Sequence, residues 1–434
     1  MLFSLDVIRA RKGDCLMLHY GEQDDPRLIM IDGGPRGVYV PHLKPRIHTI
    51  RKERGLGERD SLPVDLLMVS HVDDDHIQGI LDLTRELIPL KMARRPLPVQ
   101  VLNLWHNSFE NIIGNTPDEL TAAFKSQFGA ASTAGELPED VTLDTGDDDL
   151  DEETVVSNLK IFASIEQGAQ LRHDAERLEF PLNLEFDGGL IIAGEKGEAK
   201  EIGPGLTFTV VGPMLPELKK LHAKHQAWLK ELDKKGKSAE DVLSAYADKS
   251  VPNLSSLVVL AEAGGRRMLL TGDARGDKIL KGLELVGLLE VGGTMHVDVL
   301  KVPHHGSARN LDNDFFARIA ADHYVFSGDG EHGNPDRESL QMLLDARGDE
   351  DYTVHLTYPI EEIDVARQQD WKKEQNKEKT RQQKGSAKEV RLDWSPEENG
   401  LVAFFRNHPD FAKKVRIVEE DEPHVIDLLE AVGF

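Results

Sequence analysis

The chain has 434 residues, 39% of them hydrophobic, and a formal net charge of −25. So acidic a composition argues against indiscriminate binding to nucleic acid, because phosphate contacts rely on a basic face. The single cysteine, Cys15, excludes an internal disulfide and is consistent with a reducing cytoplasm. Because no apolar run approaches the length of a membrane span, we expect a cytoplasmic protein without membrane contact.

The first apolar strand that leads into a charged residue is Leu28 to Ile31. Asp32 follows it, and then Gly33–Gly34, which permit backbone turns that other residues resist. The pattern predicts a carboxylate placed where a strand stops and the chain turns.

The segment Ser70–His76 holds two histidines and three aspartates directly after a second apolar strand, Asp65–Val69. Alternate residues of an extended chain point the same way, so we expect His71, Asp73 and Asp75 on one side, with a helix beginning at the last residue of the segment. Carboxylates this close together need a cation or full solvation. The segment therefore predicts a metal site, and a solvated acidic turn is the alternative.

A third strand, Val101–Trp105, also ends at a histidine, His106, which is a candidate for the lining of the same cleft. Beyond it, residues 110–250 form an insertion that we expect to be largely helical. Its predicted helices span 154–180 and 214–248, and strands are predicted near 185–212. Within it, residues 136–153 hold ten acids and no base, which is typical of an exposed loop.

Two later strands again end in residues that can bind metals. Leu269–Leu270 leads into Thr271, Gly272 and Asp273, and Val299–Val302 leads into Pro303 and the pair His304–His305. The simplest geometry that explains the pattern is one cleft on which four strand ends converge.

These motifs, in this order, resemble those of the metallo-β-lactamase fold, and most of all the hydrolase domain of the competence protein ComEC and its stand-alone relatives. The motifs that carry the resemblance are Gly13–Asp14, Asp32–Gly34, Ser70–His76, Asn253–Val258, Thr271–Asp273 and Pro303–Ser307. The resemblance implies an α/β chain folded as a four-layer αββα sandwich with a helical insertion.

On this basis the first half of the fold is expected at 1–109 and the second half at 251–365, on either side of the 110–250 insertion. Residues 366–434 are expected to supply a basic linker, a closing strand and a C-terminal tail. The late turn that contains His332 resembles the His-Pro turn of ComEC-like domains.

The resemblance also implies two divalent metal ions bridged by Asp273. His71 and Asp73, helped by Asn253, are expected to hold one ion. Asp75, His76 and one of His304 and His305 are expected to hold the other, with His305 preferred. Asp32 is expected to orient a ligand imidazole from behind.

The expected catalytic residues are Asp75, Asp273, His304 and His332. Of these, His304 and His332 are the candidates for stabilising negative charge or protonating a leaving group.

Two departures from the superfamily pattern bear on the identity of the metal. Asp73 stands where the usual motif has histidine, and the usual third-motif histidine is replaced near Asn253. Oxygen ligands favour manganese or magnesium, whereas imidazole-rich sites suit zinc. We therefore expect Mn²⁺, with Zn²⁺ as the close alternative.

The resemblance favours a nuclease that cleaves DNA, a substrate assignment that composition does not provide. The alternatives are a small-molecule phosphoester, lactone or amide hydrolase, and a metal-free interaction subunit of a larger bacterial complex that acts through the 110–250 insertion. Residues 36–59 hold seven bases against two acids, and 367–391 hold nine against four. These stretches fit either a basic substrate groove or an ordinary solvated surface.

Overall fold

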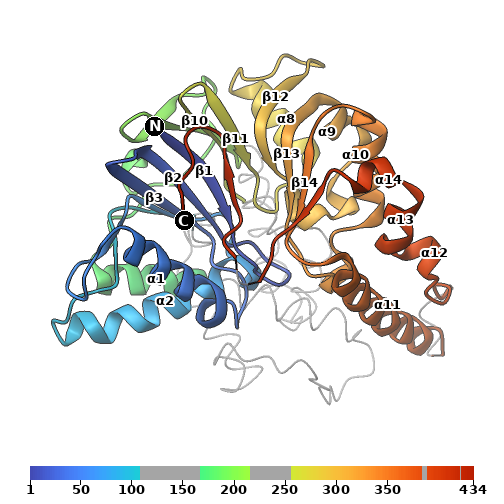
Figure 1. Ribbon diagram of the computed structural model, residues 1–434, viewed down its shortest axis with the longest axis horizontal. Coiled ribbons are helices and arrows are strands. Elements are labelled where there is room, and N and C mark those ends of the chain that lie inside the picture. Colours follow the sequence, from blue (N-terminus) through green and yellow to red (C-terminus); the bar gives the residue numbers. More distant parts are fainter. Residues whose placement is uncertain (108–166, 216–255, 384–388, 421) are drawn as a thin grey trace, which may run out of the picture.

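Two large β-sheets and the helices around them make this a mixed α/β protein (Figure 1). The computed structural model describes residues 1–107, 167–215, 256–383, 389–420 and 422–434. Across these ranges, no helix combines the length and the apolar character that a bilayer crossing requires.

The first sheet has six strands in the order β16-β1-β2-β3-β5-β7. Strands β1, β2 and β3 are antiparallel neighbours, whereas β3, β5 and β7 run parallel. Their bounds are Leu2–Val7 (β1), Leu16–Glu22 (β2), Asp25–Ile31 (β3), Leu66–Val69 (β5), Leu104–His106 (β7) and Val425–Asp427 (β16). Because Ile31 pairs with Met68, the residues that follow β3 and β5 lie side by side.

The second sheet has eight strands in the order β15-β14-β13-β12-β11-β10-β9-β8. Their bounds are Ala199–Gly203 (β8), Leu206–Gly212 (β9), Val258–Ala263 (β10), Arg266–Leu270 (β11), Met295–Lys301 (β12), Ile319–Phe326 (β13), Thr353–Leu356 (β14) and Val415–Ile417 (β15). Strands β11 to β15 are parallel, so their carboxyl ends share one edge. This edge receives the loops after β11, β12 and β13.

Helices lie outside both sheets, and a two-stranded sheet of β4 (Leu62–Val64) and β6 (Val99–Val101) adds to the first half. The helix bounds are Lys44–Glu53 (α1), Asp74–Met92 (α2), 167–178, Gly276–Leu285 (α8), Asn313–Arg318 (α9), Arg337–Arg347 (α10), Ile360–Gln383 (α11), Pro396–Asn399 (α12), Leu401–Asn407 (α13) and Pro409–Ala412 (α14). In Figure 1, α1 and α2 flank the blue strands, and α8, α9 and α10 flank the orange ones.

Three apolar clusters hold these elements together. The central one contains residues of both sheets, such as Met68 and Trp105 from the first and Phe208 and Leu270 from the second. A second cluster joins the first sheet to α1 and α2, and a third joins the second sheet to α8, α9, α10 and α13. Each sheet is therefore apolar on both faces, as near-continuous runs such as LLMV in β5 require.

The C-terminal part differs from its sequence-based interpretation. Most of the expected basic linker after residue 366 belongs to α11, because its Lys, Glu and Gln residues are good helix formers. The strands that follow are β15 in the second sheet and β16 beside β1, so the end of the chain returns to its beginning. In the insertion, the predicted strands near 185–212 correspond to β8 and β9, and the helix at 167–178 falls inside the predicted 154–180. The second predicted insertion helix, at 214–248, lies almost entirely outside the described residues.

Candidate metal centre

The first motif turns from strand into helix earlier than the sequence pattern predicts. Asp73 is the last extended residue, and α2 begins at Asp74 rather than at His76. Carboxylates are favourable in a first helical turn because the backbone N–H groups there are unpaired. Asp75 therefore does not alternate with His71 and Asp73 along an extended chain. The first turn of the helix, instead, carries Asp75 and His76 together.

Two glycines bring the start of α2 against the turn after β3. A Cβ atom on Gly79 would lie 1.9 Å from the carbonyl oxygen of Gly33, and one on Gly33 would lie 2.6 Å from the nitrogen of Ile80. The Gly33 amide donates to the carbonyl oxygen of His76 at 2.7 Å. Backbone therefore packs directly on backbone, and this contact fixes where His76 lies relative to Asp32.

The second sheet supplies Asp273 after β11 and the His304–His305 pair after β12. His304 and His305 both adopt left-handed backbone conformations, with φ of 48° and 54°, and Asp32 does so at 57°. Such conformations are costly for residues other than glycine and persist where the surrounding structure fixes them. The amide of His304 donates to the carbonyl oxygen of Gly272 at 3.1 Å, which ties the two strand ends together.

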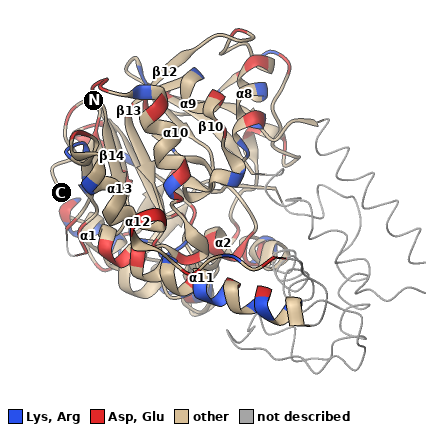
Figure 2. Ribbon diagram, turned by 90° about the vertical axis from the view of Figure 1, so that its right-hand side faces the viewer, with Lys and Arg blue, Asp and Glu red and all other residues tan. Residues whose placement is uncertain are grey.

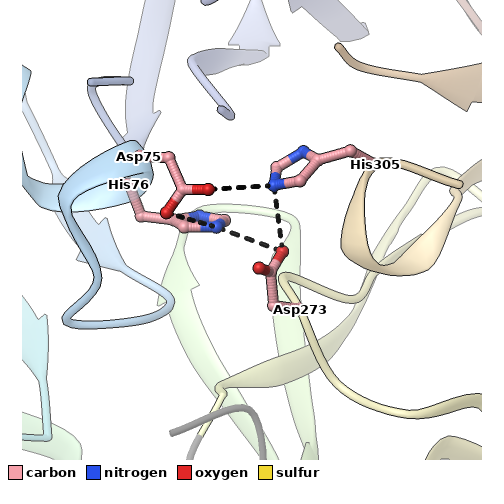
Figure 3. A group of neighbouring side chains, drawn as sticks. All are labelled: Asp75, His76, Asp273 and His305. Atoms are coloured by element: carbon pink, nitrogen blue, oxygen red, sulfur yellow. Dashed lines mark ion pairs between the residues drawn. The ribbon is translucent and has the colours of Figure 1, made fainter. Parts of the chain in front are cut away.

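Four side chains from these elements meet at one point (Figure 3). Oδ1 of Asp273 lies 3.1 Å from Nε2 of His76 and 3.3 Å from Nε2 of His305. Asp75 lies between the same imidazoles, with Oδ2 at 3.6 Å from His305 and Oδ1 at 3.9 Å from His76. One ligand atom from each residue lies within 4.8 Å of the others, so Asp75, His76, Asp273 and His305 form a group that can hold a metal ion.

The polar atoms of this group lack ordinary partners. Nε2 of His76, Nε2 of His305 and Oδ1 of Asp273 are buried, and none of them has a partner in hydrogen-bonding geometry among the described residues. Buried polar atoms without such a partner are costly. Imidazole nitrogen and carboxylate oxygen are together suited to Mn²⁺ and Zn²⁺, so the residues present fit a divalent cation.

The other oxygen of Asp273 faces a different set of side chains. Oδ2 lies 3.8 Å from Nε2 of His304, whose side chain is 27% exposed. His71 is buried, its Nδ1 lies 3.6 Å from Oδ2 of Asp73, and its ring centroid lies 5.5 Å from that of His76. Nε2 of His71 also has no partner in hydrogen-bonding geometry among the described residues. The carboxylate of Asp273 thus presents one oxygen to His76 and His305 and the other to His304, while His71 lies beside His76.

Asp32 lies directly behind His76 and hydrogen-bonds its imidazole. Nδ1–H of His76 donates to Oδ2 of Asp32 at 2.9 Å, so that Nε2 faces the cluster. The amide and hydroxyl of Ser70 hold the two carboxylate oxygens of Asp32, at 2.7 and 2.5 Å. A carboxylate behind an imidazole fixes the tautomer and the direction of the ring, as is common for histidines that bind metals.

Sequence reasoning did not count Asp14 among the site residues, although Gly13–Asp14 stood out as a motif. Asp14 is buried, and its Oδ1 lies 3.3 Å from Nδ1 of His305. A Cβ atom on Gly13 would lie 1.8 Å from the carbonyl oxygen of Asp75, so the turn packs tightly on the start of α2. Lys301, a charged residue inside the apolar run of β12, was also missed and pairs with Asp14 at 2.6 Å.

The electrostatics of the centre reflect four crowded carboxylates. Burial lowers the pKa of His76 and of His305, but in both cases Asp273 and a second aspartate outweigh it and hold the pKa well above the usual value. Burial raises the pKa of Asp273, but the surrounding histidines outweigh it and hold that pKa well below its usual value. Burial lowers the pKa of His304. The carboxylates thus favour positive charge at this position, either as protons on the histidines or as a bound cation.

Two predicted residues, Asp73 and His332, lie outside the group of four. Asp73 lies beside His71 with 30% of its side chain exposed. His332 lies on a turn at Glu331–Gly333, 47% exposed, with Nε2 at 3.8 Å from the carboxylate of Glu331. Asn253 lies outside the described residues. Its role as a ligand stays a prediction.

His106 is buried beside the first motif rather than open to a cleft. Gly168 lies between it and Val72, since a Cβ atom on Gly168 would be 3.6 Å from Nε2 of His106 and 3.3 Å from Val72. Burial lowers the pKa of His106 to about 4, which keeps its imidazole neutral.

Some residues of the basic stretches make contacts within the fold. Arg46 is buried and donates to Asp6, and Arg51 is buried and donates to the carbonyl oxygens of Asp60 and Pro98. On α11, which Figure 2 shows with several basic residues, Glu378 pairs with Arg391 of the returning chain. Arg46, Arg51 and Arg391 thus serve contacts within the fold, and the choice between a basic groove and an ordinary surface stays open for the exposed bases.

Comparison with known proteins gives one short similarity. Over 79 residues, 18% of this chain, the sequence is 34% identical to microtubule-associated protein 1A of Rattus norvegicus and equally to that of Homo sapiens. The matched segment spans 3% of the length of these relatives. No protein-family model matches the chain.

Proposed function

We propose that this chain is a metal-dependent hydrolase that cleaves phosphodiesters, with DNA as the substrate. The observation that carries the proposal is the meeting of Asp75, His76, Asp273 and His305. Buried ligand atoms of the last three have no partner in hydrogen-bonding geometry among the described residues. The finer fold assignment belongs to the same proposal. Two sheets packed face to face with helices outside each are compatible with the four-layer αββα sandwich of metallo-β-lactamase-fold hydrolases.

In this proposal Asp75, His76 and His305 hold one divalent ion, Mn²⁺ or Zn²⁺, and His71 and Asp73 hold a second, with Asp273 shared between them. Such ions supply Lewis-acid activation of water and neutralise charge on a phosphoryl oxygen. Asp32 keeps Nε2 of His76 directed at the centre. His304 is partly exposed beside Asp273, so in this proposal it can contact a substrate that binds at the metal centre. His332 is kept as a candidate proton donor for the leaving group.

A small-molecule hydrolase is the second candidate, because the net charge of −25 suits a neutral or small substrate better than a polynucleotide. A metal-free interaction subunit is the third. The similarity to microtubule-associated protein 1A is too short to carry a proposal of microtubule binding. The lone buried Cys15 supports a cytoplasmic location as part of the proposal.

The test combines metal analysis of the purified chain with digestion of single- and double-stranded DNA in Mn²⁺, Mg²⁺ or Zn²⁺. Asp273→Asn removes the shared carboxylate at constant size, and Asp298→Asn is the matched control. Asp298 is also buried on the second sheet. It accepts from the Arg267 amide at 2.7 Å and pairs with Arg266, and neither of these residues belongs to the candidate metal centre.

DNA cleavage that is lost in Asp273→Asn and kept in Asp298→Asn would support the nuclease. Bound metal without cleavage of DNA or RNA, but with turnover of chromogenic phosphoesters or lactones, would favour the small-molecule hydrolase. A chain that binds no metal would favour the interaction subunit.

A further inference from the structure

Behind the metal-facing histidines lies a second group of acidic and imidazole side chains, Asp14, Asp32 and His76, all of them buried. Its ligand atoms also lie within 4.8 Å of one another, so by residue type alone it resembles a second cation site. Within it, however, the Nζ atom of Lys301 lies 2.6 Å from Oδ2 of Asp14, and the Lys301 side chain is 1% exposed. This group therefore already contains its cation, in the form of a buried ammonium.

Asp14 connects that ammonium to the metal-facing cluster through a chain of hydrogen bonds. The hydroxyl of Ser327, just after β13, donates to Oδ1 of Asp14 at 2.5 Å. Because that hydroxyl proton is directed at Asp14, the oxygen of Ser327 is left to accept from Nδ1–H of His305 at 3.0 Å. Oδ1 of Asp14 itself lies 3.3 Å from the same Nδ1.

The direction of these bonds determines what His305 presents to the centre. With one proton kept on Nδ1, it is Nε2 that can give up its proton and offer a lone pair to a cation. Nε2 lies 3.6 Å from Asp75 and 3.3 Å from Asp273. The arrangement parallels that of His76, which Asp32 holds in the same way. The difference is that Asp32 accepts from the amide and hydroxyl of Ser70, whereas Asp14 has a lysine as counter-ion.

We propose that Lys301, Asp14 and Ser327 are positioning residues of the metal centre: the Lys301 ammonium keeps Asp14 in place as an acceptor, and Asp14 acts through Ser327 to direct Nε2 of His305 at the cluster. This inference rests on the proposed function, because it concerns the same metal centre. It also assigns a role to a buried lysine that ends β12, directly after the apolar residues Val299 and Leu300, and that packing alone would not select.

The experiment measures Mn²⁺ affinity of the full-length chain, by competition with a chelating dye, together with thermal unfolding of the metal-free protein. Asp14→Leu alone would leave a buried ammonium without a partner and is expected to unfold readily. The double variant Asp14→Leu/Lys301→Met replaces the pair with apolar side chains of similar size, which often restores stability.

We expect the double variant to unfold within a few degrees of the wild type but to bind Mn²⁺ about 10–100-fold more weakly, the usual effect of losing a partner behind a metal ligand. If the ion pair had only a structural role, the double variant would keep both the stability and the Mn²⁺ affinity of the wild type. Asp298→Asn, on the same strand as Lys301, is the control and is expected to bind as the wild type does.

Ser327→Ala provides an independent variant that leaves the ion pair intact, so the test does not depend on folding of the double variant. It is expected to weaken Mn²⁺ binding in the same direction, while thermal unfolding of the metal-free protein stays close to that of the wild type. Wild-type affinity in both Ser327→Ala and the double variant would overturn the inference. A wild-type chain that binds neither Mn²⁺ nor Zn²⁺ would instead overturn the proposed function.

Discussion

Oδ1 of Asp273 lies 3.1 Å from Nε2 of His76, although one residue follows a strand of the second sheet and the other lies in the first turn of α2. The contact joins the two halves of the chain at the carboxyl ends of their strands. Further ligand atoms gather around it, so perturbing either residue should affect both metal binding and the joining of the halves.

Replacing Asp273 with asparagine should abolish metal-dependent turnover. The carboxylate faces histidines through both of its oxygens, and an amide supplies only one neutral acceptor in its place. We expect the fall in Mn²⁺ affinity to exceed the roughly 10–100-fold typical of partners behind a ligand. Isothermal titration of the metal-free protein measures it, and equal binding by this variant and by Asp298→Asn would contradict the assignment.

Asp32→Asn should weaken metal binding while the fold persists. Asparagine tolerates the left-handed backbone that Asp32 adopts, with φ of 57°, so the substitution adds little strain. It does remove the charge that holds Nδ1–H of His76. We expect a loss of about 10–100-fold in Mn²⁺ affinity, checked by chelator competition. An unchanged Mn²⁺ affinity would show that Asp32 stabilises the turn after β3 and does not contribute to metal binding through His76.

Gly79→Ala should destabilise the protein, because the added methyl group would meet the carbonyl oxygen of Gly33 at 1.9 Å. Overpacking of this kind costs about 1–3 kcal/mol and should displace the start of α2 together with His76. Denaturant unfolding measures the cost. Gly194→Ala is the control, since a Cβ atom there has nothing within 4 Å, and a similar cost in both variants would refute the argument.

Removal of metal should lower the melting temperature. A ligand that binds only the folded state at 100 times its dissociation constant stabilises the fold by about 2.7 kcal/mol. Addition of a chelator to protein loaded with Mn²⁺ should therefore shift unfolding to lower temperature, and Asp273→Asn should not respond. A wild-type melting curve that is indifferent to the chelator would count against a metal centre.

Acid should destabilise the contact between the sheets through a chain of three histidines. Nε2 of His355 lies 3.0 Å from Nδ1 of His323, and its Nδ1 lies 2.8 Å from Nε2 of His424, just before β16. Burial, together with the charges of the two neighbouring imidazoles, lowers the pKa of His355 from 6.5 to about 2. Folding therefore favours the neutral ring, and the stability this confers is present above pH 6.5 and is lost as the pH falls.

For His355 this linkage amounts to about 2 kcal/mol between pH 6.5 and pH 5, because the unfolded state binds the proton that the folded state rejects. The free energy of unfolding, measured by denaturant titration across this range, should fall less steeply in His355→Gln than in the wild type. Parallel curves would show that His355 already carries a proton in the folded state.

Much of the candidate site could be located from the sequence because its side chains follow strand ends. Apolar runs that stop at His71, Asp273 and His305 mark positions where a buried strand delivers a side chain to an edge, and this logic needs no tertiary information. The mixed α/β class was expected from the resemblance of these motifs to the metallo-β-lactamase fold, and the two sheets with their helices confirm it. The interpretation of Asp32 as a support for a ligand imidazole agrees with its hydrogen bond to His76.

What only the tertiary structure decided were the relations between segments far apart in the sequence. The partnership of Lys301 with Asp14 joins residues on different sheets, and no local period marks it. The contacts of Asp273, with one oxygen toward His76 and His305 and the other toward His304, depend on how two sheets pack. Local patterns set which side chains leave a strand end, but the directions in which they meet are fixed by close backbone packing, such as that between Gly33 and Gly79.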